Sequence, residues 1–304
     1  MSIVFFYFSN NFFVPPKRLF FIDIKRLEWY NYVDMCRHIN NFFEVNIMNK
    51  KIMLWENPPY ISYSSNDFKP SITEFKVNDN KTAVIVCPGG GYGCKAEHEK
   101  TPIAEMFNSH GINAFTLDYN VAPCHKFAPL SDVQRAIRTV RSLGYDKIAV
   151  CGFSAGGHLT CTSATMYNFD AYEKTDSIDE YSARPDAFIP CYPVVTMDKS
   201  FTHLGSRQNL LSSEWENEEL AELFSNEKHI NSDTPPCFIW HTADDEAVPV
   251  RNSLELARAL SESGVYFEMH IFPNGNHGLG LALDRNDIGI WSDCACTFLK
   301  NIGF

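Results

Sequence analysis

The chain has 304 residues, with 26 Lys and Arg against 37 Asp and Glu, which gives a formal net charge of −11. This charge argues against a nucleic-acid partner, because phosphate binding requires clustered Lys and Arg. The length suits one open sheet with flanking helices, although length alone also allows two domains.

The first 47 residues are rich in Phe, Asn and Tyr. They lack the basic start, clean apolar stretch and small-residue cleavage site of a secretory signal, and their apolar runs are too short and interrupted to span a membrane. Three interpretations stay open: a poorly ordered extension, an extra packed helix, or translated sequence upstream of a true start at Met48, which we favour. We expect one folded domain over 48–304, beginning with a strand in KKIMLWENPPY.

A glycine-rich loop follows the β-branched segment 83–87, which predicts a buried strand. The loop, Gly89-Gly90-Gly91, allows backbone N–H groups to approach a ligand closely. The alternatives are a plain turn or a phosphate-binding loop, but neither G-K-[ST] nor a G-x-G-x-x-G in register with a helix start is present. We expect the N–H groups of Gly90 and Gly91 to bind an anionic reaction intermediate.

The segment DVQRAIRTVR, 132–141, looks basic. At helical spacing its Val133, Ala136, Ile137 and Val140 form an apolar face, and we expect the arginines on a solvated face. It is therefore not predicted to be a binding patch.

A second glycine-flanked turn joins the apolar strand 147–150 to a helix that begins at Ala155. The sequence Gly152-Phe153-Ser154-Ala155-Gly156 matches G-x-S-x-G, the tight strand-to-helix turn that exposes a nucleophilic serine. In α/β-hydrolases, a glycine-rich loop often written H-G-G-G supplies N–H donors beside such a turn, together with the residue after the serine. Here Pro88 stands in place of that histidine, and Ala155 is the third expected donor.

The second half of the chain alternates strands and helices, which predicts an α/β protein with a mostly parallel sheet covered on both faces. The expected strands are 187–191, 237–241 and 267–272, and the expected helices are 217–224, 253–263 and 290–301.

An acid and a base follow the serine in the chain order Ser, Asp, His. Asp244 and Asp245 come directly after strand 237–241, and either carboxylate fits. His277 follows strand 267–272, and histidine is the residue type most often used as a general base near neutral pH. The other histidines are weaker candidates: His158 and His241 are expected to be structural, and His98, His125 and His203 lie in loops where they could touch substrate.

Seven motifs together resemble the α/β-hydrolase esterases that bacteria use on acetylated xylan fragments, in unbroken order over about 52–300: CPGGGY, LDYNVAP, PLSDVQRAIRTVR, GFSAGGHL, RPDAFIPCYPV, TPPCFIWHTADDEAVPV and NGNHGLGLA. Feruloyl esterases and, more distantly, prolyl-oligopeptidase-type peptidases are also similar. The resemblance implies a serine esterase with Ser154, Asp245 and His277 as its catalytic triad, and it selects Asp245 through the D-x-x-V-P pattern of 245–249. Pro88 is usual in this branch.

Substrate contacts are harder to predict. Tyr92, Tyr119 and Trp215 are candidates for stacking on a sugar ring, although core packing is the commoner fate of each. The segment 196–231 interrupts the alternation of strands and helices and is a candidate lid. The resemblance, rather than any residue, favours small acyl groups such as acetyl.

The ten cysteines are scattered, and Cys294-Ala295-Cys296 is their only close pair, without a second pair or a histidine at ligand spacing. We therefore expect reduced thiols in a cytoplasmic protein, with no metal and no cofactor. The alternatives to a carbohydrate acetylesterase are a broad short-chain carboxylesterase, a prolyl-oligopeptidase-like peptidase, or a hydrolase-like protein that binds without turnover.

Overall fold

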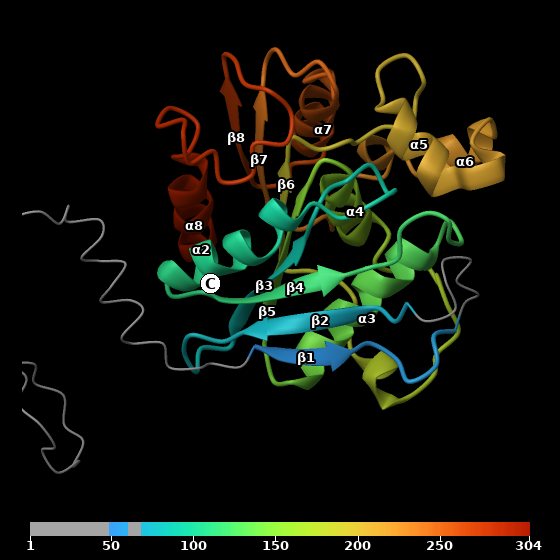
Figure 1. Cartoon of the computed structure of the whole chain (residues 1–304), viewed down its shortest axis with the longest axis vertical. Helices are drawn as coiled ribbons and strands as arrows, with labels where there is room; N and C mark the ends of the chain where they lie inside the picture. Colours follow the sequence, from blue (N-terminus) through green and yellow to red (C-terminus); the bar gives the residue numbers. More distant parts are fainter. Residues whose placement is uncertain (1–48, 60–67) are drawn as a thin grey trace, which may run out of the picture. The chain divides into compact units, whose positions relative to one another are not determined.

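The computed structural model describes residues 49–59 and 68–304. These residues contain one eight-stranded sheet with helices packed against it (Figure 1). The expectations for 1–47 lie outside these residues. The strand order is β1-β2-β4-β3-β5-β6-β7-β8, with β2 antiparallel to both β1 and β4 and every other pair parallel. The strands are β1 Lys50–Met53, β2 Ser71–Phe75, β3 Thr82–Cys87, β4 Asn113–Asp118, β5 Lys147–Phe153, β6 Ala187–Cys191, β7 Cys237–Thr242 and β8 Phe267–Phe272.

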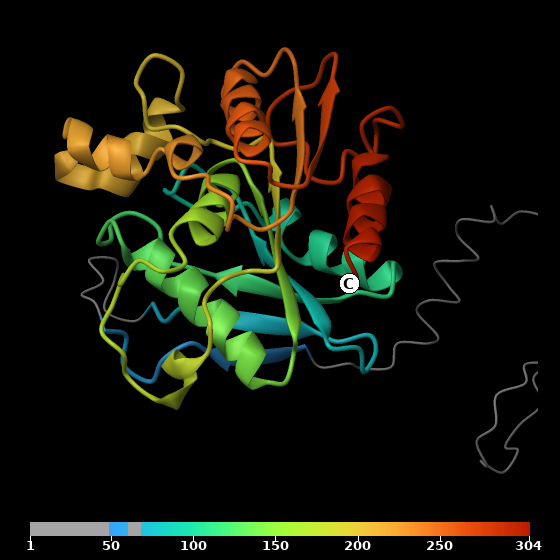
Figure 2. The same cartoon turned by 180° about the vertical axis from the view of Figure 1, so that it is seen from behind.

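Helices cover both faces of this sheet (Figures 1 and 2). Side chains of β3 alternate between two cores: Ile85 packs with α3 and α4, and Val86 packs with α2 and α8. The helices are α2 Thr101–Ser109, α3 Ala128–Ser142, α4 Ala155–Thr165, α5 Leu204–Leu211, α6 Glu218–Leu223, α7 Arg251–Glu262 and α8 Trp291–Asn301, with short 3-10 turns η2 Glu97–Glu99, η3 Ser177–Glu180, η4 Ser212–Glu214 and η5 Asn226–Lys228.

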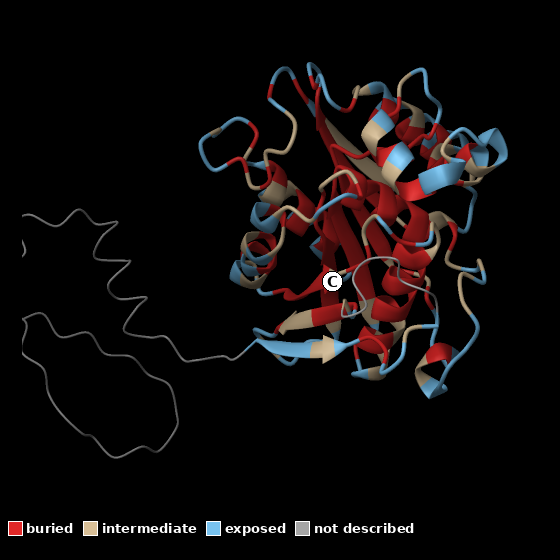
Figure 3. Cartoon of the chain, turned by 45° about the vertical axis from the view of Figure 1, so that its right-hand side comes forward, coloured by how far each residue is buried: buried red, intermediate tan, exposed pale blue. Residues whose placement is uncertain are grey.

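Burial is deepest in the central strands, and the edge strand β1 is mostly exposed (Figure 3). Strands β3 and β5 read TAVIVC and KIAVCGF, and runs of this kind are expected where a parallel strand is covered on both faces. The predicted α/β class and parallel sheet are confirmed, whereas β2 and β4 were not predicted. No helix within 49–59 and 68–304 combines the length and apolar character needed to cross a bilayer.

One arginine of α3 contradicts the expectation that the arginines of this helix lie on a solvated face. Arg135 is 1 % exposed, and its guanidinium donates hydrogen bonds to the Leu54 carbonyl and to the carboxylates of Asp176 and Asp179. Arg135 is therefore buried rather than solvated, because Asp176 and Asp179, at the start of η3 and within it, neutralise the charge of its guanidinium. The periodicity of α3 could not reveal partners that lie more than forty residues away in the chain.

Candidate active site

Ser154 lies at the sharp turn between β5 and α4. Its backbone has φ 54° and ψ −116°, a left-handed conformation that is strained for a residue with a side chain. The flanking glycines allow the turn to pack tightly: a Cβ on Gly152 would lie 2.2 Å from the Gly156 carbonyl oxygen, and a Cβ on Gly156 would lie 2.2 Å from that of Cys87. The steric reason for both glycines in G-x-S-x-G is therefore direct backbone contact.

Three predicted side chains form one hydrogen-bonded row. Ser154 Oγ lies 2.7 Å from His277 Nε2, and His277 Nδ1 lies 2.6 Å from Asp245 Oδ2. They come from the ends of β5, β7 and β8 because parallel strands bring their carboxyl ends to the same edge of the sheet. A serine paired in this way with an oriented imidazole can lose its proton and act as a nucleophile.

The two neighbouring aspartates have different partners. Asp245 is 6 % exposed, and its Oδ1 accepts the N–H groups of Ala247 and Val248, both at 2.9 Å. Asp244 instead accepts the Gly275 N–H at 2.7 Å, which ties the loop after β7 to the loop that carries His277. The structure thus brings Asp245 to the imidazole and gives Asp244 a loop contact.

Hydrogen bonds from its surroundings stabilise the negative charge of Asp245. Burial by itself would raise the pKa of this carboxyl, but hydrogen bonds from His241, His277 and the Val248 N–H outweigh burial and hold the pKa well below its usual range. Asp245 is therefore ionised at neutral pH and can stabilise a positive charge on His277.

The glycine-rich loop after β3 lies beside the serine. A Cβ on Gly89 would lie 3.1 Å from Ser154 Cβ, and positive φ values of 125° and 60° at Gly90 and Gly91 shape the turn. In the described part of the chain, neither the Gly90 nor the Gly91 N–H donates to another residue. Ala155 is the first residue of α4, where N–H groups have no helical acceptor. These three donors can therefore serve an anion near Ser154.

Glu99, which the sequence did not single out, links this loop to the loop carrying His277. The side chain is buried, and its two oxygens accept the Gly89 N–H at 2.8 Å and the Tyr192 hydroxyl at 2.5 Å. The same hydroxyl accepts the Gly280 N–H, and the Tyr192 ring packs edge-on against His277. The signal in the sequence was weak, because a lone glutamate in a 3-10 turn has no distinguishing pattern.

The segment 196–231 contacts the glycine-rich loop through helix α5. Asn209 Nδ2 donates to the Gly91 carbonyl at 2.8 Å, and a Cβ on Gly91 would lie 3.6 Å from His203 Cε1. His203 Nδ1 accepts the Ser206 N–H at 3.2 Å and lies 2.8 Å from Ser206 Oγ, which can also donate to it; in the neutral ring that accepts these bonds, Nε2 carries the proton. Burial, followed by the nearby charge of His277, lowers the pKa of His203 and favours this neutral form.

Two of the three aromatic candidates do not face a substrate. Tyr92 and Tyr119 are 1 % and 0 % exposed, and their hydroxyls hydrogen-bond to His158 Nδ1 and to the Pro88 carbonyl. Stacking on a sugar is therefore wrong for both rings, because the core covers their faces. Trp215 is half-buried, with Lys199 Nζ 5.3 Å from its ring centroid, and its role in binding stays a prediction.

Two histidines outside the row make structural contacts, as expected. His158 is buried, its Nε2 donates to the Phe224 carbonyl, and burial lowers its pKa to about 4. His241 is also buried: its Nδ1 lies 2.8 Å from Ser253 Oγ, and its Nε2 lies 3.0 Å from the Val248 carbonyl oxygen and 3.3 Å from Asp245 Oδ2. Both rings therefore hold elements together and have no free nitrogen for acid–base chemistry.

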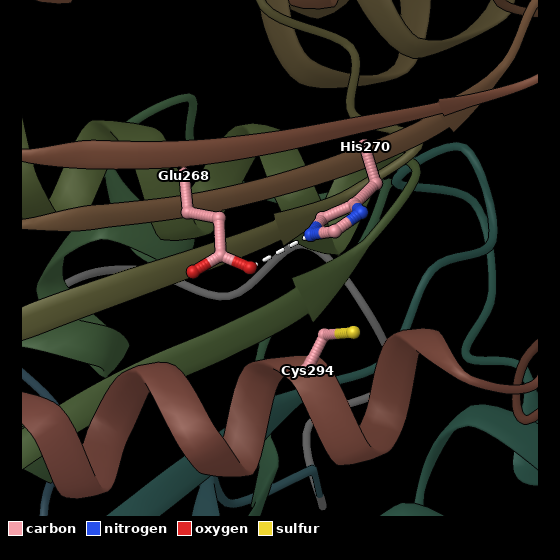
Figure 4. Close-up of side chains that lie close together, drawn as sticks. All are labelled: Glu268, His270 and Cys294. Atoms are coloured by element: carbon pink, nitrogen blue, oxygen red, sulfur yellow. Dashed lines mark hydrogen bonds and ion pairs between the residues drawn. The ribbon is translucent and has the colours of Figure 1, made fainter.

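Apart from this site, one group of side chains in the described residues could hold a metal: Glu268, His270 and Cys294 (Figure 4). Their ligand atoms all lie within 4.8 Å of one another. Burial, then the negative charges of Glu268 and Asp293, raises the pKa of the Cys294 thiol. The sequence did not suggest this group, because Cys294 lies on α8, more than twenty residues after Glu268 and His270 on β8.

The strand order, the turn at Ser154 and the row of Ser154, His277 and Asp245 define an α/β hydrolase with a serine-centred site. The BD-FAE family matches residues 72–260, and the chain belongs to this family.

The chain is similar to several named proteins. Endo-1,4-beta-xylanase B of Butyrivibrio fibrisolvens is 37 % identical over 79 % of this chain and 39 % of its own length. Acetylxylan esterase of Xylanibacter ruminicola is 29 % identical over 74 % of this chain and 45 % of its own length. The chain therefore spans less than half the length of these curated relatives. The solved structure of an acetyl ester-xyloside bifunctional hydrolase from Caldicellulosiruptor lactoaceticus is 41 % identical, covers 84 % of this chain and 97 % of its own, and has a TM-score of 0.78.

Proposed function

We propose that this protein is a serine carboxylesterase that hydrolyses small acyl esters through an acyl-enzyme intermediate. The observation that carries the proposal is the hydrogen-bonded row from Ser154 through His277 to Asp245, with distances of 2.7 and 2.6 Å. The N–H groups of Gly90 and Gly91, which donate to no other residue in the described part of the chain, support it, because acyl transfer needs donors for an oxyanion.

The reaction follows from these positions. Ser154 Oγ attacks the ester carbonyl while its proton passes to His277 Nε2, and Asp245 stabilises the imidazolium. The carbonyl oxygen becomes an oxyanion that accepts hydrogen bonds from the N–H groups of Gly90, Gly91 and Ala155. His277 then gives its proton to the departing alcohol oxygen, and water, activated by the same imidazole, releases the acid and restores Ser154.

For the substrate, we propose acetyl esters on xylan-derived oligosaccharides. The names of the Xylanibacter and Caldicellulosiruptor proteins support this class. We further propose that His203 Nε2–H donates a hydrogen bond to a sugar hydroxyl next to the ester, since the ring lies beside Gly91 with Nδ1 already engaged. A cytoplasmic location stays a prediction from the scattered cysteines, to be checked by cell fractionation.

A substrate panel tests the activity and separates the alternatives. Acetylated xylo-oligosaccharides, p-nitrophenyl esters of rising chain length and an aminoacyl-proline amide are offered to the purified full chain. We expect turnover of the acetyl esters, falling as the acyl chain lengthens. Equal rates across chain lengths favour a broad carboxylesterase, cleavage of the amide favours a peptidase, and no turnover at all favours a binding protein.

The nucleophile is tested by Ser154→Ala. Removing one hydroxyl creates no large cavity, so we expect a folded protein whose kcat falls at least about 10⁴-fold, with a residual rate from the oxyanion donors. Ser261→Ala, at an exposed position of α7, is the matched control and should keep the wild-type rate. Activity of the Ser154 variant within tenfold of wild type contradicts the assignment.

The sugar contact is tested by His203→Ala. Loss of one neutral hydrogen bond should lower kcat/KM for the oligosaccharide about tenfold. The kcat/KM for p-nitrophenyl acetate, which has no sugar, should not change. His229→Ala, which removes another histidine of the same segment, is the control. An equal fall on both substrates refutes a sugar-specific contact and leaves the esterase proposal standing.

A further inference from the structure

The edge strand β8 and the last helix α8 bring three metal-ligating side chains to one place. Glu268 and His270 are two residues apart on β8, so they project from the same face of the strand. Figure 4 shows both pointing toward α8, with the Cys294 thiol turned toward them. We propose that Glu268, His270 and Cys294 bind a divalent transition-metal ion of the zinc class, with water as the fourth ligand.

The donor set selects this class of ion. Imidazole nitrogen and thiolate sulfur favour zinc-like ions, whereas Mg²⁺ and Ca²⁺ take oxygen ligands. On binding, the thiol proton of Cys294 passes to solvent. The thiolate and the Glu268 carboxylate then carry two negative charges, which a divalent ion neutralises.

The spacing requires little movement. Ligand atoms in a tetrahedral zinc site are about 3.4 to 3.7 Å apart, given bonds of about 2.0 to 2.3 Å. Glu268 Oε1 and His270 Nε2 are now hydrogen-bonded at 2.7 Å, and all three ligand atoms lie within 4.8 Å of one another. The contact between Glu268 Oε1 and His270 Nε2 therefore has to lengthen slightly, which the flexible Glu268 side chain allows. The Cys294 sulfur has to move closer to both atoms.

The imidazole is already oriented. The His270 ring packs against two aromatic neighbours, Phe238 and Phe272, with ring centroids 5.3 and 6.3 Å away. The side chains of Glu268 and His270 are 39 % and 31 % exposed, so an ion can enter from solvent. An ordered ring in a partly open site loses little conformational entropy when a metal binds.

A bound ion would join β8 to α8. These elements flank residues 273–290, which include His277, so the ion would hold both ends of the segment that carries the base. Binding to the folded state alone also raises the thermal midpoint as metal is added. The proposal is independent of the esterase activity.

Cobalt(II) is the probe, because its absorption spectrum reports both thiolate ligation and four-coordinate geometry. The full chain, kept reduced and stripped of metal with a chelator, is titrated with Co²⁺ without oxygen. We expect one equivalent to produce a near-ultraviolet thiolate-to-cobalt band and strong visible bands, which Zn²⁺ then removes. Absence of the thiolate band at excess Co²⁺ overturns the proposal.

Variants locate the site. Cys294→Ser should abolish the thiolate band, and both it and His270→Gln should weaken binding by about 100-fold or more, since even changes around a metal's ligands cost 10- to 100-fold. Cys94→Ser, at an exposed cysteine outside the group, is the matched control and should leave the spectrum unchanged. If one of these variants unfolds when the chelator removes its metal, Glu268→Gln provides a third ligand variant. A band that survives Cys294→Ser, or disappears in Cys94→Ser, refutes the assignment.

Discussion

Replacing Asp245 by asparagine exchanges one carboxylate oxygen for an NH₂ group and barely changes the size of the side chain. The orientation of the new amide follows from the backbone. Oδ1 accepts two backbone N–H groups, from Ala247 and Val248, which can only donate, whereas Oδ2 faces the imidazoles of His277 and His241, which can change tautomer. The amide oxygen therefore stays on the backbone side, and the NH₂ faces His277 Nδ1. The imidazole then carries its proton on Nε2, where it donates to Ser154 and cannot accept the serine proton.

The expected loss in kcat is about three to four orders of magnitude, as for the equivalent change in a serine protease triad. At about 1.4 kcal/mol per tenfold, this corresponds to about 4 to 5 kcal/mol of transition-state stabilisation. Initial rates on p-nitrophenyl acetate measure kcat, and thermal unfolding checks that the variant remains folded.

Asp244→Asn is the matched control, since it makes the same chemical change one residue away. Its amide oxygen can still accept the Gly275 N–H, so we expect kcat near wild type and a loss of at most about 1 kcal/mol in the free energy of unfolding. The reasoning is refuted if Asp245→Asn retains kcat within tenfold of wild type, or if the two variants exchange their effects.

Two further predictions concern buried groups outside the reaction. Tyr92→Phe removes the hydroxyl 2.8 Å from His158 Nδ1 and leaves that nitrogen only the longer contact to Thr162 Oγ1 at 3.4 Å, so urea unfolding should show a loss of about 1 to 3 kcal/mol with kcat within about threefold of wild type; unchanged stability with selective loss of sugar-ester turnover would restore the stacking role. For Asp179, burial raises the pKa, but hydrogen bonds from Tyr172, Thr175 and Arg135 lower it to about 2, below the unfolded value of about 3.9. Its contribution is present above about pH 5 and lost as pH falls toward 2, so wild type should lose about 2 kcal/mol more than Asp179→Asn over that range; parallel pH profiles of unfolding would contradict the assigned pKa.

The sequence by itself determined the local backbone structure around the candidate nucleophile. The strand 147–150, the glycines around Ser154 and the helix from Ala155 were predicted because a tight turn imposes steric needs within five residues. The alternation of later strands and helices likewise indicated a parallel sheet, and such a sheet places the ends of its strands at a common edge. The candidate serine, acid and base were therefore predicted from the sequence, although the choice between Asp244 and Asp245 came from family resemblance.

Tertiary structure alone decided the surroundings of each side chain. Tyr92 and Tyr119 are in the core, Arg135 is neutralised by carboxylates from another segment, and Glu99 connects two loops of the site. The group of Glu268, His270 and Cys294 depends on helix α8 packing beside strand β8. Burial and partners of this kind arise from contacts between residues tens of positions apart, and no periodic pattern in the chain encodes them.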